Sequence, residues 1–345
     1  MKRTELSELG EFGLIDRIKE TVLLRNTNTI RGIGDDAAVM EYGETCVLVS
    51  TDLLVEGIHF DLSYVPLRHL GYKAVVVNLS DIAAMNAIPQ HITVSVALSN
   101  RFSVEAVTEL YEGISLACEH YGIDLVGGDT TTSPAGLTIS ITAMGTAARA
   151  DIAYRNTARP GDVICVTGDL GAAYLGLQVL EREKQEFLAN PDMEPKLDDK
   201  EYLVGRQLKP EARTDIIYDF RDLGIVPSSM IDISDGLASD LLHLCKASGT
   251  GAAIYEAELP ADDATLLTAT EFNMSPTTCI MNGGEDYELL FTVSQQQYEK
   301  LRNHRDIKAI GVMRDAGEGV LLMSSAGNPY VVQAQGWNHF GDNKL

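Results

Sequence analysis

The sequence predicts a mixed α/β (α+β) protein of two domains, with mixed sheets and packed helices. The chain has 345 residues, which is long enough for about two domains at roughly 100–200 residues each. Apolar residues at helical spacing alternate with short apolar strands, and both hairpins and helical crossovers connect them. The segment Arg155–Asp162 then changes the composition, with two arginines, a Pro and a Gly. We therefore expect an N-terminal domain over 1–148 and a C-terminal domain over 149–345.

Composition and charge narrow the class of protein. Hydrophobic residues make up 45% and charged residues 22% of the chain, which is typical of a soluble globular protein. The net charge of −23 disfavours nucleic acid and anionic membranes as partners. No apolar run reaches the roughly 18 residues of a membrane span, and no signal peptide is visible. Five scattered cysteines without a Cys-x-x-Cys motif indicate reduced thiols, so we expect a cytoplasmic protein.

The N-terminal half shows alternating helical and strand patterns. A helix over 66–85 is the most unusual, because it carries the polar sequence Asn78–Asp81 inside an otherwise apolar stretch. A strand over 45–51 ends at Asp52, and a short buried strand over 123–126 leads into a Gly-rich loop, Gly127–Thr132. The elements expected are helices over 5–24, 66–85 and 104–121 and strands over 37–40, 45–51, 91–99, 123–126 and 137–148.

The C-terminal half continues the alternation. The charged segment 184–202 contains Pro191 and Pro195 and few apolar residues, so we interpret it as a helix end and a loop that form an insertion. A loop-rich stretch is expected over 260–278. The remaining elements expected are helices over 168–183, 210–223, 237–248 and 294–301 and strands over 162–166, 230–233, 252–257, 287–291, 307–312 and 319–323.

Acidic residues stand beside Gly, Ser or Thr at five separate junctions. They are Asp36, Asp52, Asp81, Asp129 and the pair Asp232 and Asp235. Carboxylate and hydroxyl oxygens without His or Cys favour Mg²⁺ over zinc. The sequence has no G-x-x-x-x-G-K-[ST] loop, no kinase-like Gly loop and no His-rich zinc pattern. Because phosphoryl transfer depends on positioning and charge neutralisation, this pattern predicts a Mg-dependent enzyme that handles phosphates.

Each motif alone also has an ordinary structural explanation. Asp35 and Asp36 fit a solvated turn, Asp81 fits an exposed helix face, and Gly127–Thr132 fits a tight turn. By default, His59 is a surface histidine, Glu285 a turn acid, Arg155 an exposed linker residue and Trp337 a packing residue. A non-catalytic protein that binds Mg²⁺ or Ca²⁺ could carry the same oxygen donors, and it would show no ATP dependence.

Taken in order, seven motifs resemble the thiamine-monophosphate kinase family over almost the whole chain. They are Gly32–Ala38, Ser50–Asp52, His59–Phe60, Asn78–Met85, Gly127–Thr131, Asp232–Gly236 and Gly283–Tyr287. The resemblance implies two α/β domains of the aminoimidazole ribonucleotide synthetase superfamily and a homodimer. It also implies a kinase that uses ATP and several Mg²⁺ ions to convert thiamine monophosphate to thiamine diphosphate, with ATP in the region of the N-terminal domain.

The resemblance further implies roles for individual residues. The implied metal ligands are Asp36, Ser50, Thr51, Asp52, Asp81, Asp129, Asp232 and Asp235. The implied ATP contacts are Tyr111, Gly128, Asp129, Arg155 and Ser234, and the implied thiamine monophosphate contacts are His59, Glu285 and Trp337. The γ-phosphoryl group would pass in line to the substrate phosphate without a general base. Whether Asp35 is a ligand stays open.

Two related enzymes are the nearest alternatives. A selenophosphate synthetase would need a reactive Cys or selenocysteine in a Gly-rich N-terminal segment, and the sequence has none there. An aminoimidazole ribonucleotide synthetase does not carry Gly32–Asp36 together with His59–Phe60. One departure from the kinase pattern is Asn86, where the family usually has Gly, and Asn tolerates the same left-handed conformation.

Overall fold

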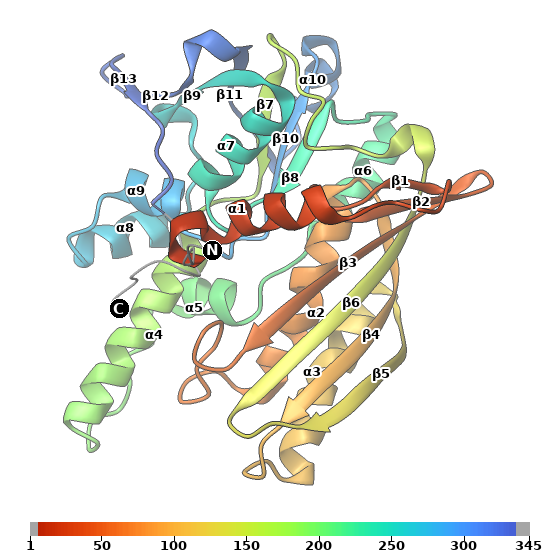
Figure 1. The fold of residues 1–345 in the computed structure, drawn as a ribbon. Helices are drawn as coiled ribbons and strands as arrows, with labels where there is room; N and C mark the ends of the chain where they lie inside the picture. Colours follow the sequence, from red (N-terminus) through yellow and green to blue (C-terminus); the bar gives the residue numbers. More distant parts are fainter. Residues whose placement is uncertain (1–5, 336–345) are drawn as a thin grey trace.

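The computed structural model of the chain describes residues 6–335 and contains two mixed β-sheets (Figure 1). The first sheet has the strand order β1-β2-β3-β6-β4-β5. Its strands are β1 (Thr29–Arg31), β2 (Ala38–Tyr42), β3 (Thr45–Val55), β4 (Ile88–Leu98), β5 (Asp124–Thr132) and β6 (Leu137–Ala148). Neighbouring strands are antiparallel except β4 and β5, which run parallel.

Helices cover one face of this first sheet. Three α-helices and one 3₁₀ turn belong to this half of the chain: α1 (Leu6–Thr21), α2 (Leu67–Ala84), α3 (Val104–Tyr121) and η1 (Arg149–Asp151). Figure 1 shows α2 and α3 lying side by side behind the strands. Their backbones touch, since a Cβ at Gly113 would lie 1.9 Å from the carbonyl oxygen of Arg68. Helix α3 begins at its cap Ser103 and ends at Gly122, whose φ of 64° needs a residue without Cβ strain.

The second sheet has the strand order β13-β12-β9-β11-β7-β10-β8. Its strands are β7 (Val163–Thr167), β8 (Ser229–Asp232), β9 (Thr250–Tyr255), β10 (Leu289–Val293), β11 (Ile307–Asp315), β12 (Val320–Met323) and β13 (Pro329–Val331). The helical segments around it are α4 (Ala172–Ala189), α5 (Glu201–Leu208), α6 (Thr214–Leu223), α7 (Leu237–Ser248), η2 (Glu256–Glu258), α8 (Asp263–Glu271), α9 (Pro276–Asn282), α10 (Gln295–Leu301) and η3 (Ala316–Glu318).

Helix α2 joins the cores of the two halves. Most of its residues are buried, as expected of a helix that is apolar all round. Leu70, Val75 and Leu79 pack in the core under the first sheet. Ala83 and Ala84, one turn further on, pack in a core formed by residues of α6, β7 and β10. The helix therefore fixes the two sheets relative to each other, and its buried polar residues Lys73 and Ser80 contact residues of the other half.

The structure confirms the predicted mixed α/β fold and corrects several elements. Most of the expected buried strand and Gly-rich loop over 123–132 is one exposed edge strand, β5, which within residues 6–335 pairs only with β4. Strand β3 continues past Asp52 to Val55, because Leu53 to Val55 go on pairing with β6. The stretch 260–278 holds α8 and the start of α9 rather than a loop throughout. Helix α4 extends to Ala189, so the segment 184–202 is partly helical. The insertion itself and the domain boundary near residue 148 stay predictions.

The cysteines and the helices bear on two expectations about the protein's environment. All five cysteines are free, and Cys118 is the single one that is not fully buried, in line with reduced thiols. Among the helices of residues 6–335, none has both the length and the apolar character that crossing a bilayer requires.

Candidate functional site

Three carboxylates from three elements meet where the two halves join. Asp36 precedes β2, Asp81 lies on α2, and Asp232 ends β8. One oxygen of each carboxylate lies within 4.8 Å of one oxygen of each of the others. Two of these residues come from motifs in the N-terminal half and one from the second sheet, so the group forms only when both halves are folded together.

Neighbouring hydroxyls hold two of these carboxylates in place. Ser80 on α2 donates a hydrogen bond of 2.6 Å to Asp232 Oδ2, which ties β8 to α2. Ser50 on β3 donates to Asp81 Oδ2. On the same helix, Asn78 Oδ1 accepts from the backbone N–H of Asp52 at 2.9 Å. The polar residues of the predicted Asn78–Asp81 motif thus face the site, while the apolar residues around them pack in the core.

The electrostatics of the group are unfavourable for ionised carboxylates. Burial raises the pKa of Asp36 to about 7, although the Arg155 guanidinium opposes this shift. Burial and the charges of Asp52, Asp232 and Asp36 raise the pKa of Asp81 well above its usual range. Burial also raises the pKa of Asp232 to about 6, against the hydrogen bond from Ser80. The negative charges are therefore not balanced by the protein around them.

Arg155 is the basic side chain paired with this group. Its Nη2 bonds to Asp36 Oδ1, and its Nε lies 3.5 Å from Asp35 Oδ1. Asp35 is also paired with Arg31 at 2.8 Å, and its side chain is fully buried. Asp35 is thus neutralised by two arginines and lies outside the three-carboxylate group, whereas Asp36 shares one arginine and reaches the group.

The donor set fits a hard divalent cation. Carboxylate oxygens are the ligands that Mg²⁺ and Ca²⁺ prefer, at about 2.0–2.6 Å from the ion. Oxygens on opposite sides of such an ion are therefore about 4–5 Å apart, and the spacing here does not exceed 4.8 Å. A bound cation would also relieve the repulsion that raises the pKa values of the three carboxylates.

Two further predicted ligands lie close to the group and one points away. Burial and the charge of Glu11 raise the pKa of Asp52 to about 6, and Asp52 in turn acts on Asp81 and Asp232. Asp235 also acts electrostatically on Asp232. The structure does not bring the Thr51 hydroxyl to the group, because neighbouring strand residues face opposite sides and Thr51 Oγ1 donates to the carbonyl of Ile141 at 3.0 Å.

Asp129 is separated from the carboxylate group along the sheet. It lies on the exposed edge strand β5, where its Oδ1 accepts from the N–H of Thr130 at 2.9 Å. Strands β4 and β6 stand between β5 and β3. With strands about 4.8 Å apart, Asp129 is about 14 Å along the sheet from the position of Leu53, the neighbour of Asp52.

The predicted nucleotide residues fall in two places. Tyr111, Gly128 and Asp129 line one hollow of about 520 Å³ between α3 and the edge of the sheet, together with Val94, Leu125, Val126, Gly127 and Thr130. Gly128 has no room for a side chain, since a Cβ there would lie 1.8 Å from the carbonyl oxygen of Val94. Arg155 and Ser234 instead lie by the carboxylate group, where the Ser234 carbonyl accepts from the N–H of Glu285.

Of the three predicted substrate residues, the structure describes His59 and Glu285. His59 lies on the loop after β3, and its Nδ1 accepts from the N–H of Val55 at 3.0 Å. Glu285 lies in the segment before β10 and is paired with Lys73 on α2 at 3.1 Å. Trp337 lies outside the described residues.

Sequence reasoning missed two buried polar residues of this region. Asp240 on α7 is 3% exposed, and burial raises its pKa well above the usual range, with the charges of Asp235 and Asp232 adding to the shift. Its position among the apolar residues Leu237, Leu241 and Leu244 was the sequence signal that could have indicated a buried carboxylate. Lys73 is 4% exposed in the middle of the apolar helix α2, and such an isolated lysine should have indicated a buried partner.

Comparison with known families places this architecture in a defined class. The model of the AIR synthase related protein N-terminal domain matches residues 34–147, and that of the AIR synthase related protein C-terminal domain matches residues 159–323. The chain is thus an AIR synthase related protein with both domains of that class.

Individual relatives narrow the assignment. The chain is 35% identical over 335 residues to the thiamine-monophosphate kinase of Aquifex aeolicus (strain VF5), covering 97% of this chain and 99% of the relative. It is 37% identical to the thiamine-monophosphate kinase of Escherichia coli (strain K12), covering 96% and 98%. The solved structure of AaThiL complexed with AMPPCP and TMP matches with a TM-score of 0.83 and 34% identity, covering 98% of this chain and 100% of that one.

The chain belongs to the thiamine-monophosphate kinase family. The resemblance stated from the sequence motifs is confirmed, and so is the prediction of an enzyme of the thiamine-phosphate kinase type. The roles of the individual site residues stay predictions.

Proposed function

We propose that this protein uses ATP and Mg²⁺ to phosphorylate thiamine monophosphate to thiamine diphosphate, by direct in-line transfer of the γ-phosphoryl group. The relatives named thiamine-monophosphate kinase, and the AaThiL structure with AMPPCP and TMP, support ATP and thiamine monophosphate as substrates. The acceptor is a phosphate oxygen that is already ionised, so the reaction needs no strong general base.

The observation that carries the proposal is the group of Asp36, Asp81 and Asp232 at the junction of the two halves. A kinase must hold two strongly anionic phosphates together, and a chain with a net charge of −23 cannot do so with its own lysines and arginines. Mg²⁺ held by these carboxylates, with Ser50, Asp52 and Asp235 nearby, would neutralise the charge that develops on the transferred group. Arg155 would orient Asp36 and contact phosphate as a planar fork.

The proposed acceptor site extends along helix α2. Asp81 lies at the carboxylate group, and Lys73, which holds Glu285, lies eight residues before it on the same helix. At 1.5 Å per residue these positions are about 12 Å apart along the axis, and they are about 80° apart around the helix, so both can border one site. We therefore place the phosphate of thiamine monophosphate at the carboxylates and its rings towards Glu285 and His59, with Trp337 as a further ring contact.

We place the ATP base in the hollow lined by Tyr111 and Gly128, where an aromatic ring and a bare backbone favour a flat ligand. Asp129 lies in the same hollow, far along the sheet from Asp52. We also propose a homodimer. Its support is the exposed edge strand β5 with Leu125 and Val126, which are 39% and 55% exposed, and the family resemblance.

The test is ADP release from ATP in the presence of Mg²⁺, with and without thiamine monophosphate. We expect release that requires both Mg²⁺ and the acceptor, and thiamine diphosphate as the second product. Release that does not increase when thiamine monophosphate is added would reject the kinase assignment.

A further inference from the structure

The segment that carries Glu285 is held in an unusual backbone conformation. Glu285 has φ of 65° and Tyr287 has φ of 53°, two left-handed residues other than Gly within three positions. Such residues are strained and persist where the surroundings fix them. Here the N–H groups of Glu285 and Tyr287 donate to the carbonyls of Ser234 and Ile233 at 2.8 and 2.9 Å. The structure thus fixes the position of Glu285 against the segment that follows Asp232.

The side chain of Glu285 is held as firmly as its backbone. Lys73 Nζ lies 3.1 Å from Oε1, and Gln207 Nε2 donates to Oε2 at 2.7 Å. Lys73 Nζ also donates to the carbonyl of Gln207 at 2.9 Å. These three residues come from α2, from α5 and from the segment before β10. Each carboxylate oxygen of Glu285 therefore has one fixed donor and keeps a further lone pair for a ligand.

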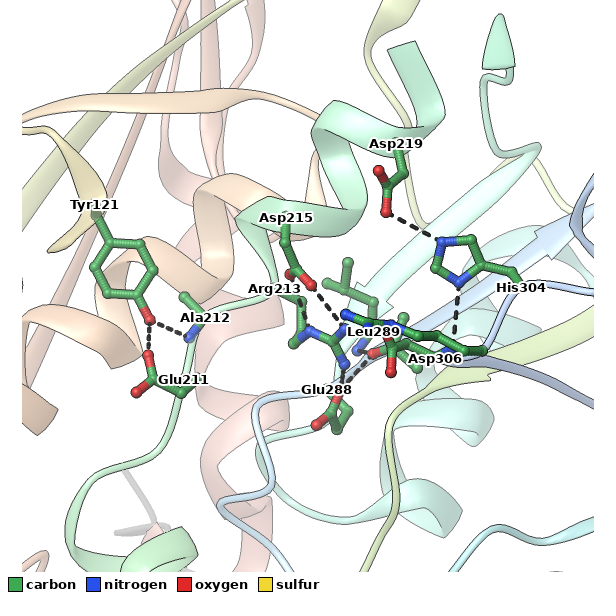
Figure 2. A network of polar contacts seen from close by, with 12 residues as sticks. Tyr121, Glu211, Ala212, Arg213, Asp215, Asp219, Glu288, Leu289, His304 and Asp306 are labelled. Carbon is green, nitrogen blue, oxygen red and sulfur yellow. Dashed lines mark hydrogen bonds and ion pairs between the residues drawn. The ribbon is translucent and has the colours of Figure 1, made fainter. Parts of the chain in front are cut away.

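Helix α5, which carries Gln207, is itself anchored by a buried carboxylate. Glu288 is 1% exposed and accepts from Arg206 at 2.9 Å and from Arg213 at 2.7 Å. Figure 2 shows Arg213 between Asp215 and Glu288, and Tyr121 of α3 bonded to Glu211 and to the N–H of Ala212. Arg206 also donates to the carbonyl of Asp286, the residue after Glu285, at 3.2 Å. Gln207 and Glu285 are therefore tied to one rigid network.

Two features of this arrangement point to a ligand rather than to packing. Glu285 keeps a side-chain exposure of 30%, although Lys73 beside it has only 5%. Gln207 is only 6% exposed. Its side-chain oxygen, Oε1, accepts no hydrogen bond from the described residues. A buried amide oxygen without a donor has lost its hydrogen bonds to water and destabilises the protein. A ligand that brings an N–H group would satisfy it.

We propose that Lys73 and Gln207 position Glu285 to recognise an aromatic ring that carries an amine, as the pyrimidine ring of thiamine monophosphate does. This rests on the proposed contact between Glu285 and the substrate. The Lys73 ammonium offsets the charge of Glu285, so the pair attracts a cationic ring only weakly, and recognition depends on the direction of its free lone pairs. Gln207 Oε1 is a second acceptor beside them. Lys73 and Gln207 are thus specificity-determining residues of the acceptor site.

The experiment compares the Kd for thiamine monophosphate, measured by calorimetry in the full-length protein with Mg²⁺, between wild type and Lys73→Met, Lys73→Arg and Gln207→Leu. We expect Lys73→Met and Gln207→Leu to raise this Kd about tenfold, as loss of a charge-assisted or buried hydrogen bond does. The KM for ATP should stay within about twofold, and Lys73→Arg should restore most of the affinity. Lys200→Met is the matched control, because Lys200 also has two polar partners, Glu271 and Thr268, and contacts neither Glu285 nor Gln207.

A substrate analogue without the pyrimidine amine gives the second comparison. It should bind wild type about tenfold more weakly than thiamine monophosphate, and Gln207→Leu should discriminate far less between the two. A Kd that falls in Lys73→Met would show that Lys73 only neutralises Glu285, and equal rises in the Kd for thiamine monophosphate and the KM for ATP would show a structural role. Either result, or full discrimination by Gln207→Leu, overturns the proposal. Absence of turnover in wild type with intact binding would instead reject the proposed function.

Discussion

Replacing Asp232 by Asn should make the cation-free protein more stable and less active at the same time. Asp232 is 4% exposed, and burial beside other acids raises its pKa from an ordinary 3.8 to about 6. This increase of the pKa of Asp232 corresponds to an upper bound of roughly 3 kcal/mol for keeping the group ionised in the folded protein. Asn removes the charge and keeps an oxygen that can accept from Ser80. We therefore expect a gain of about 1–3 kcal/mol at pH 8.

The stability difference between Asp232→Asn and wild type should increase with pH. Because the pKa of Asp232 in the folded protein is above its ordinary value, the contribution of Asp232 to stability is fully present below pH 3.8 and is lost as the pH rises through about 6. The melting temperature of Asp232→Asn, measured by calorimetry in EDTA, should exceed that of wild type by about 1–4 °C at pH 8 and by little near pH 4. Activity should fall at least about 100-fold, since one ligand loses its charge.

Addition of Mg²⁺ completes the measurement. Mg²⁺ should raise the melting temperature of wild type at pH 8 clearly more than that of Asp232→Asn. Asp222→Asn, an exposed residue on α6, is the control and should behave as wild type. A variant that is less stable than wild type at pH 8 in EDTA would refute the reasoning. So would a difference that does not change between pH 4 and pH 8, or equal stabilisation of both proteins by Mg²⁺.

Two further predictions concern packing and the C-terminal segment. Gly113→Ala should destabilise the protein by about 3 kcal/mol in denaturant titration, because its Cβ would lie 1.9 Å from the carbonyl oxygen of Arg68; Gly205→Ala, with no atom within 4 Å of the added Cβ, should be neutral, and equal effects would refute the tight crossing of α2 and α3. Trp337→Ala should raise the KM for thiamine monophosphate much more than the KM for ATP in steady-state kinetics; an equal rise in both would remove Trp337 from the acceptor site.

Local patterns predicted most of the helices and strands, and they failed where an element is defined by its partners. The apolar residues Leu125 and Val126 indicated a buried strand, yet β5 lies at the edge of the sheet and is exposed. The number of strands that pair with a segment is a non-local property, so the sequence of β5 contains no signal for it. Short elements such as β1 and β13, with three residues each, have no detectable periodicity.

In the candidate site, too, local motifs could be predicted from the sequence and contacts between distant residues could not. Asp36, Asp81 and Asp232 could be predicted because each stands in a local motif of Gly, Ser and acid, and the structure brings all three together. It could not be predicted that Asp36 joins the carboxylate group whereas Asp35 pairs with two arginines. Both outcomes depend on Arg31 and Arg155, which pair with the Oδ2 and the Oδ1 oxygen of Asp35. Lys73 was overlooked for the same reason, since its partner Glu285 belongs to the other half of the chain.

The carboxylate group links folding to ligand binding. Asp36 and Asp81 belong to the half with the first sheet and Asp232 to the second sheet, so their mutual repulsion opposes the contact between the halves. Apolar packing offsets this repulsion, because Ala83 and Ala84 at the end of α2 are fully buried in the core of the second half. A cation that binds the three carboxylates removes the repulsion and therefore stabilises the same contact. If the proposed Mg²⁺ binds there, its affinity for the site and the association of the two halves must rise and fall together.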